Sequence, residues 1–338
     1  MSHPRAYVVA TEPVPGAAEQ AFARFGPITV AEDDRLAART HAEVLIVRTS
    51  SISANMLEEM PRLRVIARTG VGIDNIDLTA VSRRGIPLLH APAAASRPIA
   101  EGTLALIFAA TKRLPELGSL VREGRWRERY SYEVADLHGA VLGVVGLGRV
   151  GSEVAKLGRA LGMNVVACDP RYGRCGPPPP APATMMSLSE LFACADVTTL
   201  HCPLTESTRG MINRELLAAG KRGTVLINAS RGPLVDETAL VAALNEGWLA
   251  AVGLDVFSFE PPKPDTVLLR HPRVVCTPHT VGLSRAWNAQ VFNSLADDVE
   301  CILGGEPPTN IANPEVLGAA RGRARAAPQK DGARIGLR

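Results

Sequence analysis

Short apolar runs rich in β-branched residues alternate with stretches of helical periodicity from Ala6 to about Leu89. Continuous apolar runs separated by helical segments are typical of parallel strands that are covered on both faces of their sheet. The pattern therefore predicts a βα repeat in the first part of the chain. Its expected strands are Tyr7–Ala10, Val44–Val47, Arg64–Arg68 and Ile86–Leu89.

A second series of the same kind begins at Val141. Several strands separated by helical segments predict a second doubly wound, mostly parallel sheet, so the expected fold class is α/β with two such domains. The six expected strands are Val141–Gly146, Asn164–Cys168, Asp196–Leu200, Thr224–Asn228, Ala250–Leu254 and Arg273–Thr277.

Two helices are expected to connect these domains. Ile99–Gly118 has an apolar stripe and no proline before Pro115, which predicts one long helix, and a last amphipathic helix follows Gly282. We expect the last helix to return to the first domain, so that the second domain is an insertion. The expected division is residues 1–100 with 285–318, the inserted residues 101–284, and a basic, disordered tail at 319–338.

Composition narrows the class of protein. With 338 residues, 46% of them hydrophobic and 21% charged, the chain can bury two sizeable cores. The net charge is +3, but the tail at 319–338 holds six basic residues and one acid, which leaves about −2 on the rest. Such a body has no electrostatic footprint for nucleic acid, so a small-molecule substrate is expected.

The six cysteines form no C-x-x-C pair and have no metal-ligand spacing. We expect free thiols in a reducing compartment, and no metal. The N-terminus lacks the long apolar segment of a signal peptide, and no apolar stretch approaches the ~18–20 residues of a membrane span. These features predict a cytoplasmic protein with no membrane partner.

A glycine-rich motif follows the first strand of the second series. Gly146, Gly148 and Gly151 form a G-x-G-x-x-G between an apolar strand and an amphipathic helix. The first glycine suits a tight turn, the second lets the backbone approach a pyrophosphate, and the third allows close packing of helix on strand. In this context the motif predicts a Rossmann-type dinucleotide site rather than a plain structural turn.

An acid lies where the second strand of such a site should end. Asp169 follows the glycine motif by about twenty residues, the spacing expected of the ribose-binding acid. Its carboxylate would accept hydrogen bonds from the ribose hydroxyls and repel a 2′-phosphate, which favours NAD over NADP. Arg171 and Arg174 follow closely and would weaken that preference.

Polar side chains follow three later strands. The segments are Asn228–Asp236, Asp255–Pro261 and Thr277–Gly282, and each begins at the carboxyl end of a predicted strand, where ligands bind in such sheets. Taken singly, Arg231 fits a surface ion pair, Glu260 a loop carboxylate and His279 a loop histidine. Taken together, they indicate a catalytic site.

These segments, with Arg68–Asn75 and Gly146–Gly151, resemble the motifs of the D-2-hydroxyacid dehydrogenase family in type, order and approximate spacing. The resemblance runs from roughly residue 40 to residue 313 and is nearest to phosphoglycerate dehydrogenases and hydroxypyruvate or glyoxylate reductases. It implies a Rossmann domain inserted into a flavodoxin-like substrate domain. It also implies a homodimer built around the long helix, here Glu101–Gly118.

The resemblance implies hydride transfer between NAD and C2 of a small D-2-hydroxy or 2-oxo acid. His279 would donate the proton in reduction and accept it in oxidation. Glu260 would hold the other ring nitrogen and favour the imidazolium. Arg231 would bind the substrate carboxylate and carbonyl oxygen, because its planar fork matches a planar anion.

Further binding residues are expected on the same basis. The backbone of Gly70, Val71 and Gly72 would contact the substrate carboxylate, and Arg68, Arg83 and Arg97 would form a cationic pocket for a substrate phosphate. The expected cofactor contacts are Gly146, Gly148, Arg149, Val150, Gly151, Asp169, Cys202, Pro203, Ala229, Ser230, Arg231, Asp255, His279, Val281 and Gly282.

The chain also departs from the family's pattern. Members commonly have asparagines where this chain has His90–Pro98, and a histidine where it has Gly102. The identity of the substrate is therefore open, and the chain leaves no room for the regulatory domain of long phosphoglycerate dehydrogenases. The alternatives are an NAD(H)-sensing binding protein like the related corepressors, and, more weakly, an enzyme that oxidises phosphite or formate.

Overall fold

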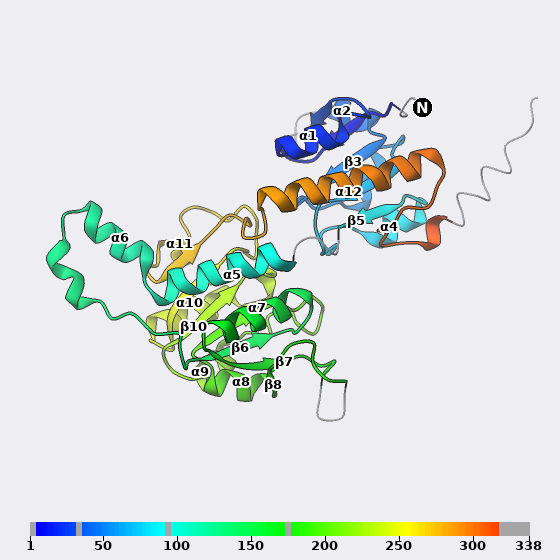
Figure 1. Cartoon of the computed structure of the whole chain (residues 1–338). Helices are drawn as coiled ribbons and strands as arrows, with labels where there is room; N and C mark the ends of the chain where they lie inside the picture. The colour runs from blue at the N-terminus through cyan, green and yellow to red at the C-terminus, as the bar shows by residue number, and fades with distance from the viewer. Residues whose placement is uncertain (1–4, 32–35, 92–95, 173–176, 318–338) are drawn as a thin grey trace, which may run out of the picture. The chain divides into compact units, whose positions relative to one another are not determined.

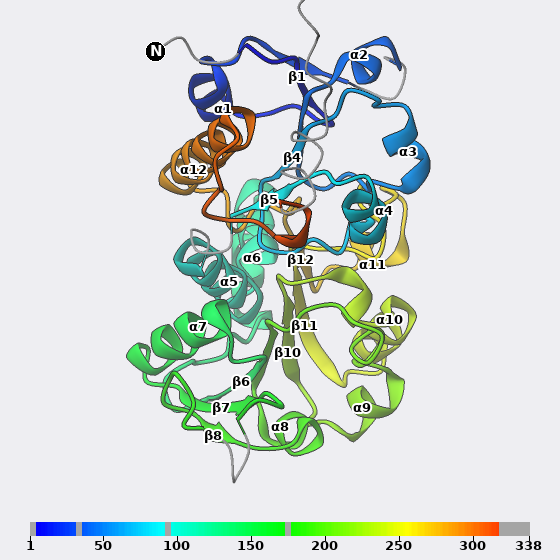
Figure 2. The ribbon, with the colours of Figure 1, turned by 90° about the vertical axis from the view of Figure 1, so that its right-hand side faces the viewer.

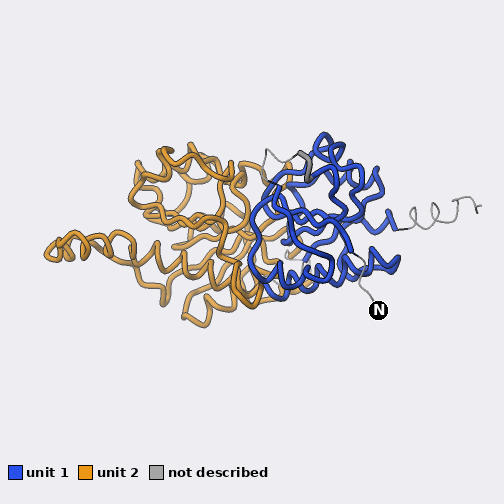
Figure 3. The backbone as a smooth tube through the Cα atoms, turned by 90° about the horizontal axis from the view of Figure 1, so that it is seen from above, with its two compact units in different colours: residues 1–93, 288–338 blue, residues 94–287 orange. Residues whose placement is uncertain are grey.

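The computed structural model describes residues 5–31, 36–91, 96–172 and 177–317. The chain divides into two compact units, residues 1–93 with 288–338, and residues 94–287 (Figure 3). The expected tail at 319–338 lies outside the described residues.

The first unit contains a five-stranded parallel sheet in the order β2-β1-β3-β4-β5, the flavodoxin-like order. Four of its strands coincide with the expected apolar runs, whereas β2 was not predicted. Its three residues follow Gly26-Pro27 at the sheet edge, where so short a run carries little periodicity. The strands are β1 Val8–Ala10, β2 Ile28–Val30, β3 Val44–Val47, β4 Val65–Arg68 and β5 Leu88–His90.

Short helices connect these strands, and the long C-terminal helix belongs to the same unit from residue 288 onward. Arg24 holds that helix through ion pairs to Asp297 (3.0 Å) and Glu300 (2.7 Å). The helices are α1 Gly16–Phe22, α2 Leu36–His41, α3 Ala54–Glu58, α4 Leu78–Arg83 and α12 Arg285–Gly304.

The second unit contains a seven-stranded parallel sheet in the order β12-β11-β10-β9-β6-β7-β8. Counted from β6, this is the 3-2-1-4-5-6 order of a Rossmann fold with one further strand, so the predicted fold class is confirmed. The edge strand β8 was not predicted, because it is only two residues long. The strands are β6 Val141–Val145, β7 Asn164–Cys168, β8 Thr184–Met185, β9 Val197–Leu200, β10 Thr224–Asn228, β11 Leu249–Leu254 and β12 Val274–Cys276.

Helices cover both faces of this sheet and bury two apolar layers against it (Figure 2). Within the described residues, no helix combines the length and the apolar character needed to cross a membrane. The helices of this unit from α7 onward are α7 Arg149–Ala160, α8 Leu188–Cys194, α9 Arg214–Ala219, α10 Glu237–Asn245 and α11 Val267–Arg270. A 3₁₀ turn, η2, lies at Gly232–Leu234.

The expected single helix Ile99–Gly118 is wrong, because the structure contains two helices there. Helix α5 (Ser96–Thr111) ends before Arg113, whose φ of 51° is left-handed, and α6 (Leu114–Arg122) begins after it. Pro115 stands in the first turn of α6, where a proline is favoured. Proline thus marked a helix start and not the interior of a longer helix.

Residues 112–136, which we call the arm, carry α6 and the 3₁₀ turn η1 (Trp126–Ser131) away from the sheet of the second unit (Figure 1). The arm returns to the end of α5, where the amide of Ala135 donates to the carbonyl of Thr111 at 3.1 Å. Lys112 adds an ion pair to Asp136 at 3.2 Å. The base of the arm is therefore fixed, while its distal part has no support from its own sheet.

Candidate active site

The glycine motif forms a tight turn between β6 and α7. Gly146 has a φ of 92°, and a Cβ there would lie 2.6 Å from the carbonyl oxygen of His201. A Cβ on Gly151 would lie 2.0 Å from the carbonyl oxygen of Gly146. Both positions exclude any larger residue, because the backbone of the turn packs against its neighbours without a gap.

Gly148 differs, because its position is open rather than crowded. Among the residues that the structure describes, a Cβ there would meet only the guanidinium of Arg171, at 3.6 Å, and Gly148 caps the amino terminus of α7. Arg149 and Val150 begin that helix. An unobstructed backbone at a helix amino terminus suits a pyrophosphate, so the residues present fit a dinucleotide.

Asp169 follows β7 beside this turn and is 7% exposed. Its Oδ2 accepts a 2.7 Å hydrogen bond from the amide of Leu147. The side chain of Arg171 also bonds to it, and this bond is the main reason that the pKa of Asp169 lies below its ordinary value. Asp169 is therefore an ionised acceptor joined to the glycine turn. Arg174 lies outside the described residues.

The three polar segments converge because β10, β11 and β12 are neighbours in the sheet. Asn228 ends β10, Asp255 follows β11, and Thr277 follows β12. A Cβ on Gly232 would lie 1.9 Å from the carbonyl carbon of Phe257, so the loops after β10 and β11 are in direct contact. This contact brings Arg231 and Glu260 into one site.

His279 and Glu260 form an ion pair, with 2.7 Å between Nδ1 and Oε2. Burial by itself raises the pKa of Glu260, but the hydrogen bond and positive charge of His279 outweigh it, together with the amide of Phe257. The net pKa of Glu260 is lowered, so Glu260 is a carboxylate that accepts from the ring. The proton that His279 exchanges with a substrate is consequently the one on Nε2.

Arg231 is half-buried beside this pair, and its positive charge also helps to lower the pKa of Glu260. Its Nη1 donates to the carbonyl of Ser230 at 2.7 Å, while Asn228 donates through Nδ2 to the carbonyl of Arg231 at 2.8 Å. These bonds fix the loop that presents the guanidinium.

Asp255 positions the loop that carries His279. It is 2% exposed, and its Oδ1 accepts from the hydroxyl of Thr277 (2.6 Å) and the amide of Thr280 (2.7 Å). His279 has a φ of 54°, a left-handed conformation that is costly for a non-glycine residue. Burial raises the pKa of Asp255 despite these bonds. Asp255 thus holds a strained backbone in place.

The other expected cofactor contacts line the same edge of the sheet. Ser230 donates through Oγ to the carbonyl of Cys202 at 2.7 Å, which links the loops after β9 and β10. Burial raises the pKa of Cys202 to about 11, so its thiol is a poor nucleophile. Pro203 and Ala229 lie beside these two residues in sequence, and Val281 and Gly282 follow His279.

His201 lies against the glycine turn, where its carbonyl oxygen would be 2.6 Å from a Cβ on Gly146. Burial lowers its pKa to about 3, and its Nε2 lies 2.9 Å from the hydroxyl of Thr199.

Gly102 is a site residue that sequence reasoning treated only as a missing histidine. A Cβ there would lie 2.5 Å from both the Cβ and the carbonyl oxygen of Val281. Helix α5 therefore packs directly on the loop that carries His279, and a side chain at this position would displace that loop. The signal that could have revealed this contact was a glycine inside an otherwise regular helix.

The residues of the expected cationic pocket come from both units. Arg68 ends β4 at the carboxyl edge of the first sheet, is 6% exposed, and donates through Nε to Asn75 at 3.2 Å. Arg83 lies in the last turn of α4, which returns the chain toward the amino end of β5. Arg83 therefore lies toward the amino edge of that sheet, whereas Arg68 lies at its carboxyl edge. The shared phosphate site stays a prediction.

Arg97 lies in the second unit, where its Nε pairs with Glu101 at 2.8 Å and its Nη1 with Glu153 at 3.6 Å.

The turn after β4 consists of Gly70, Val71 and Gly72, and Val71 is 47% exposed. A Cβ on Gly70 would lie 2.6 Å from Nη1 of Arg68. This glycine is therefore required for Arg68 to fold over the turn.

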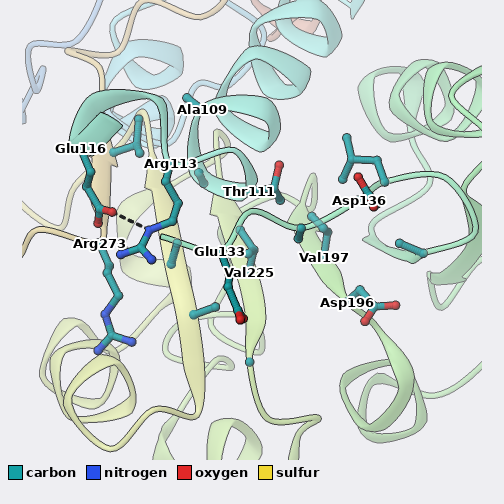
Figure 4. A pocket seen from close by; sticks show the side chains of 18 of the residues that line it. Ala109, Thr111, Arg113, Glu116, Glu133, Asp136, Asp196, Val197, Val225 and Arg273 are labelled. Carbon is teal, nitrogen blue, oxygen red and sulfur yellow. Dashed lines mark hydrogen bonds and ion pairs between the residues drawn. The ribbon is translucent and has the colours of Figure 1, made fainter. Parts of the chain in front are cut away.

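A cavity of about 640 Å³ lies in the second unit at the amino edge of the sheet, away from these loops (Figure 4). The end of α5, the base of the arm and the starts of β9, β10 and β12 line it. Its charged residues are Arg113, Glu116, Glu133, Asp136, Asp196 and Arg273, of which Arg113 and Glu116 pair at 2.5 Å. Acids outnumber bases on this wall.

Residues 104–281 match the family described as "D-isomer specific 2-hydroxyacid dehydrogenase, NAD binding domain". A D-3-phosphoglycerate dehydrogenase of Methanocaldococcus jannaschii is 35% identical over 311 residues, which cover 90% of this chain and 59% of that protein. A glyoxylate reductase of Korarchaeum cryptofilum is 37% identical over 272 residues, which cover 80% and 82%. The chain spans 51–59% of the length of the first two phosphoglycerate dehydrogenases that it matches.

A solved structure with a similar fold is the D-lactate dehydrogenase of Aquifex aeolicus complexed with NAD and lactic acid. Its TM-score is 0.78 at 27% identity, and the match covers 90% of this chain and 98% of that one. These relatives are dehydrogenases and reductases, so the corepressor alternative has no support.

Proposed function

The chain belongs to the D-isomer specific 2-hydroxyacid dehydrogenase family, and we propose that it is an NAD-dependent oxidoreductase acting at C2 of a small D-2-hydroxy or 2-oxo acid. The observation that carries the proposal is the ion pair of His279 and Glu260 beside Arg231, at the edge of the sheet that also holds the glycine turn. A purely structural histidine would not need a strained backbone held by a buried acid.

The residues of the chain divide the chemistry among them. The nicotinamide, when bound, supplies or accepts the hydride. Arg231 binds the carboxylate of a 2-oxo acid and stabilises the negative charge that develops on the C2 oxygen. His279 protonates that oxygen from Nε2 in reduction and removes the proton in oxidation, while Glu260 stabilises the charged ring and fixes its orientation.

The test is His279→Ala. We expect a rate loss of about 10²–10⁴ with NADH binding retained, because only the proton transfer is removed. His138→Ala is the matched control, since His138 is exposed in the same unit and lies outside the three catalytic loops. Unchanged turnover by His279→Ala would contradict the proposed function.

The substrate is proposed as 3-phosphoglycerate, or as the hydroxypyruvate and glyoxylate pair. NADH oxidation with hydroxypyruvate, glyoxylate, phosphohydroxypyruvate and bulkier 2-oxo acids would distinguish these. Reduction of none of them would contradict the proposal.

We also propose that the chain forms a homodimer through the arm. Of the nine large apolar side chains that are exposed among the described residues, five lie on the arm: Leu114, Val121, Trp126, Tyr130 and Val134. Such a concentration supports a protein partner. A second copy fits by charge, because Arg127 and Arg129 of η1 can meet the lining of the cavity at the base of the arm, where acids outnumber bases, and a two-fold axis would pair both sets at once.

The double variant Trp126→Asp with Tyr130→Asp should be monomeric in sedimentation and still folded. Val267→Asp is the control, because Val267 is 66% exposed on α11. A dimer that withstands both arm substitutions would show that another surface is used.

A further inference from the structure

The side chain of Arg171 is hydrogen-bonded to the carboxylate of Asp169, which should receive the ribose of the dinucleotide. Its backbone amide and Nε donate to Oδ1 of Asp169 at 2.9 and 3.0 Å, and its Nη2 donates to Oδ2 at 2.8 Å. The amide of Leu147 donates to the same Oδ2. A carboxylate offers about four acceptor sites. All four are therefore filled from within the chain.

The two partners differ in exposure. The side chain of Asp169 is 4% exposed and is tied to the glycine turn through Leu147, whereas the side chain of Arg171 is 59% exposed. The guanidinium also lies 5.2 Å from the ring of Tyr172, its sequence neighbour. Arg171 can therefore leave Asp169 without disturbing a core, and Asp169 cannot leave the turn.

The position of the guanidinium places a cation within the dinucleotide site. Its Nη2 lies 3.6 Å from where a Cβ of Gly148 would be, so it stands over the open backbone of the turn. While it is bonded to Asp169, it also neutralises the carboxylate whose negative charge would otherwise repel an approaching 2′-phosphate. Both effects act on the discrimination between the two dinucleotides.

We propose that Arg171 is a specificity-determining residue that competes with the ribose hydroxyls for Asp169 and, when displaced, binds the 2′-phosphate, so that the site accepts NADPH as well as NADH. This inference rests on the nicotinamide dinucleotide use proposed above. A ribose diol must displace Nε or Nη2 to reach the carboxylate, which weakens NADH binding. A 2′-phosphate gains the released guanidinium as a charge-assisted, bidentate partner.

The competing interpretation is that Arg171 only braces Asp169. If Arg171 only holds Asp169 in place, its removal should weaken the binding of NADH and NADPH equally, because both dinucleotides need the carboxylate in the same position. If Arg171 competes with the ribose and binds the 2′-phosphate, its removal should strengthen the binding of NADH and weaken that of NADPH. The sign of the two changes therefore separates the interpretations.

The experiment measures the dissociation constants of NADH and NADPH by fluorescence titration, and those of ADP-ribose and its 2′-phosphate by calorimetry, which needs no turnover. The unmodified protein should bind NADPH within about tenfold of NADH. Arg171→Ala should bind NADH and ADP-ribose severalfold more tightly and the two 2′-phosphorylated ligands at least tenfold more weakly. Arg159→Ala, an exposed arginine in the last turn of α7, should change neither.

Equal weakening of both dinucleotides by Arg171→Ala, or no change in either, would overturn the inference. Failure of the unmodified protein to bind any of the four ligands would instead overturn the proposed function, and the inference with it.

Discussion

Replacing Glu260 with glutamine should separate the two directions of the reaction. The substitution keeps one oxygen that can accept from Nδ1 of His279, removes the negative charge, and places an amide NH₂ where Oε1 accepts from the amide of Phe257. The charged form of the ring loses its partner, whereas the neutral form keeps its hydrogen bond. Reduction, which needs a protonated His279, should therefore suffer more than oxidation.

The geometry sets the size of the effect. A 2.7 Å contact between opposite charges is a charge-assisted hydrogen bond, worth about 1.5–3 kcal/mol against about 0.5–1.5 kcal/mol for a neutral one. The side chain of His279 is 35% exposed and that of Glu260 25% exposed, which favours the lower end of the difference, about 1 kcal/mol. That value corresponds to about a fivefold loss of the rate of reduction.

The assay is the initial rate of NADH oxidation with a 2-oxo acid between pH 5 and 9, and of the reverse reaction. In Glu260→Gln the maximal rate of reduction should fall about fivefold, and the maximal rate of oxidation should fall less. Glu237→Gln is the control, because Glu237 accepts from the amide of Ser258 at 2.8 Å in the same loop without reaching the histidine. An equal loss of maximal rate in both directions would refute the reasoning.

Three further substitutions test other parts of the structure. Gly102→Ala should lower stability by about 1–3 kcal/mol in thermal unfolding and should also lower turnover, because its Cβ would overlap Val281; Gly16→Ala, with nothing within 4 Å, should lower neither. Arg68→Ala should raise the KM for 2-oxo acids, whereas Arg83→Ala should leave it unchanged, and equal effects would contradict their placement at opposite edges. Glu12→Gln should cost about 1–2 kcal/mol in denaturant titrations at pH 7. Burial raises the pKa of Glu12, but hydrogen bonds from Thr49 and Ser50 outweigh it, so that the net pKa is lowered. The stability that Glu12 contributes is therefore present at pH values above the ordinary pKa of a glutamate and is lost as the pH falls through the lowered pKa. A destabilisation by Glu12→Gln that persists in acid would contradict this reasoning.

The two sheets could be predicted from the sequence because their central strands are buried on both faces. A strand such as β10, buried throughout, produces a continuous apolar run between turns. The edge strands β2 and β8 have two or three partly exposed residues and leave no such run. Short edge strands are held by pairing with a neighbour, which a local pattern does not report.

The positions of the catalytic loops could be predicted for a similar reason. Each follows a strand whose place in the sheet is set by its apolar run, so the sequence pattern alone assigns Arg231 and His279 to one edge. The position of Arg83 could not be obtained in this way. Its distance from Arg68 depends on where the short helix α4 ends relative to the sheet, and a six-residue helix places its last turn near the opposite edge.

The position of Gly102 shows how a departure from a family pattern can be a packing requirement. Where relatives commonly have a histidine, this chain has a glycine, and the sequence alone suggests only a lost polar group. In the structure the missing side chain lets α5 approach within van der Waals distance of Val281, two residues after the strained His279. Asp255 holds the same loop from the side of the sheet through Thr277 and Thr280. The loop is thus held between a buried acid and a helix backbone. These contacts offset the energetic cost of the left-handed conformation of His279, which directs the imidazole toward Glu260.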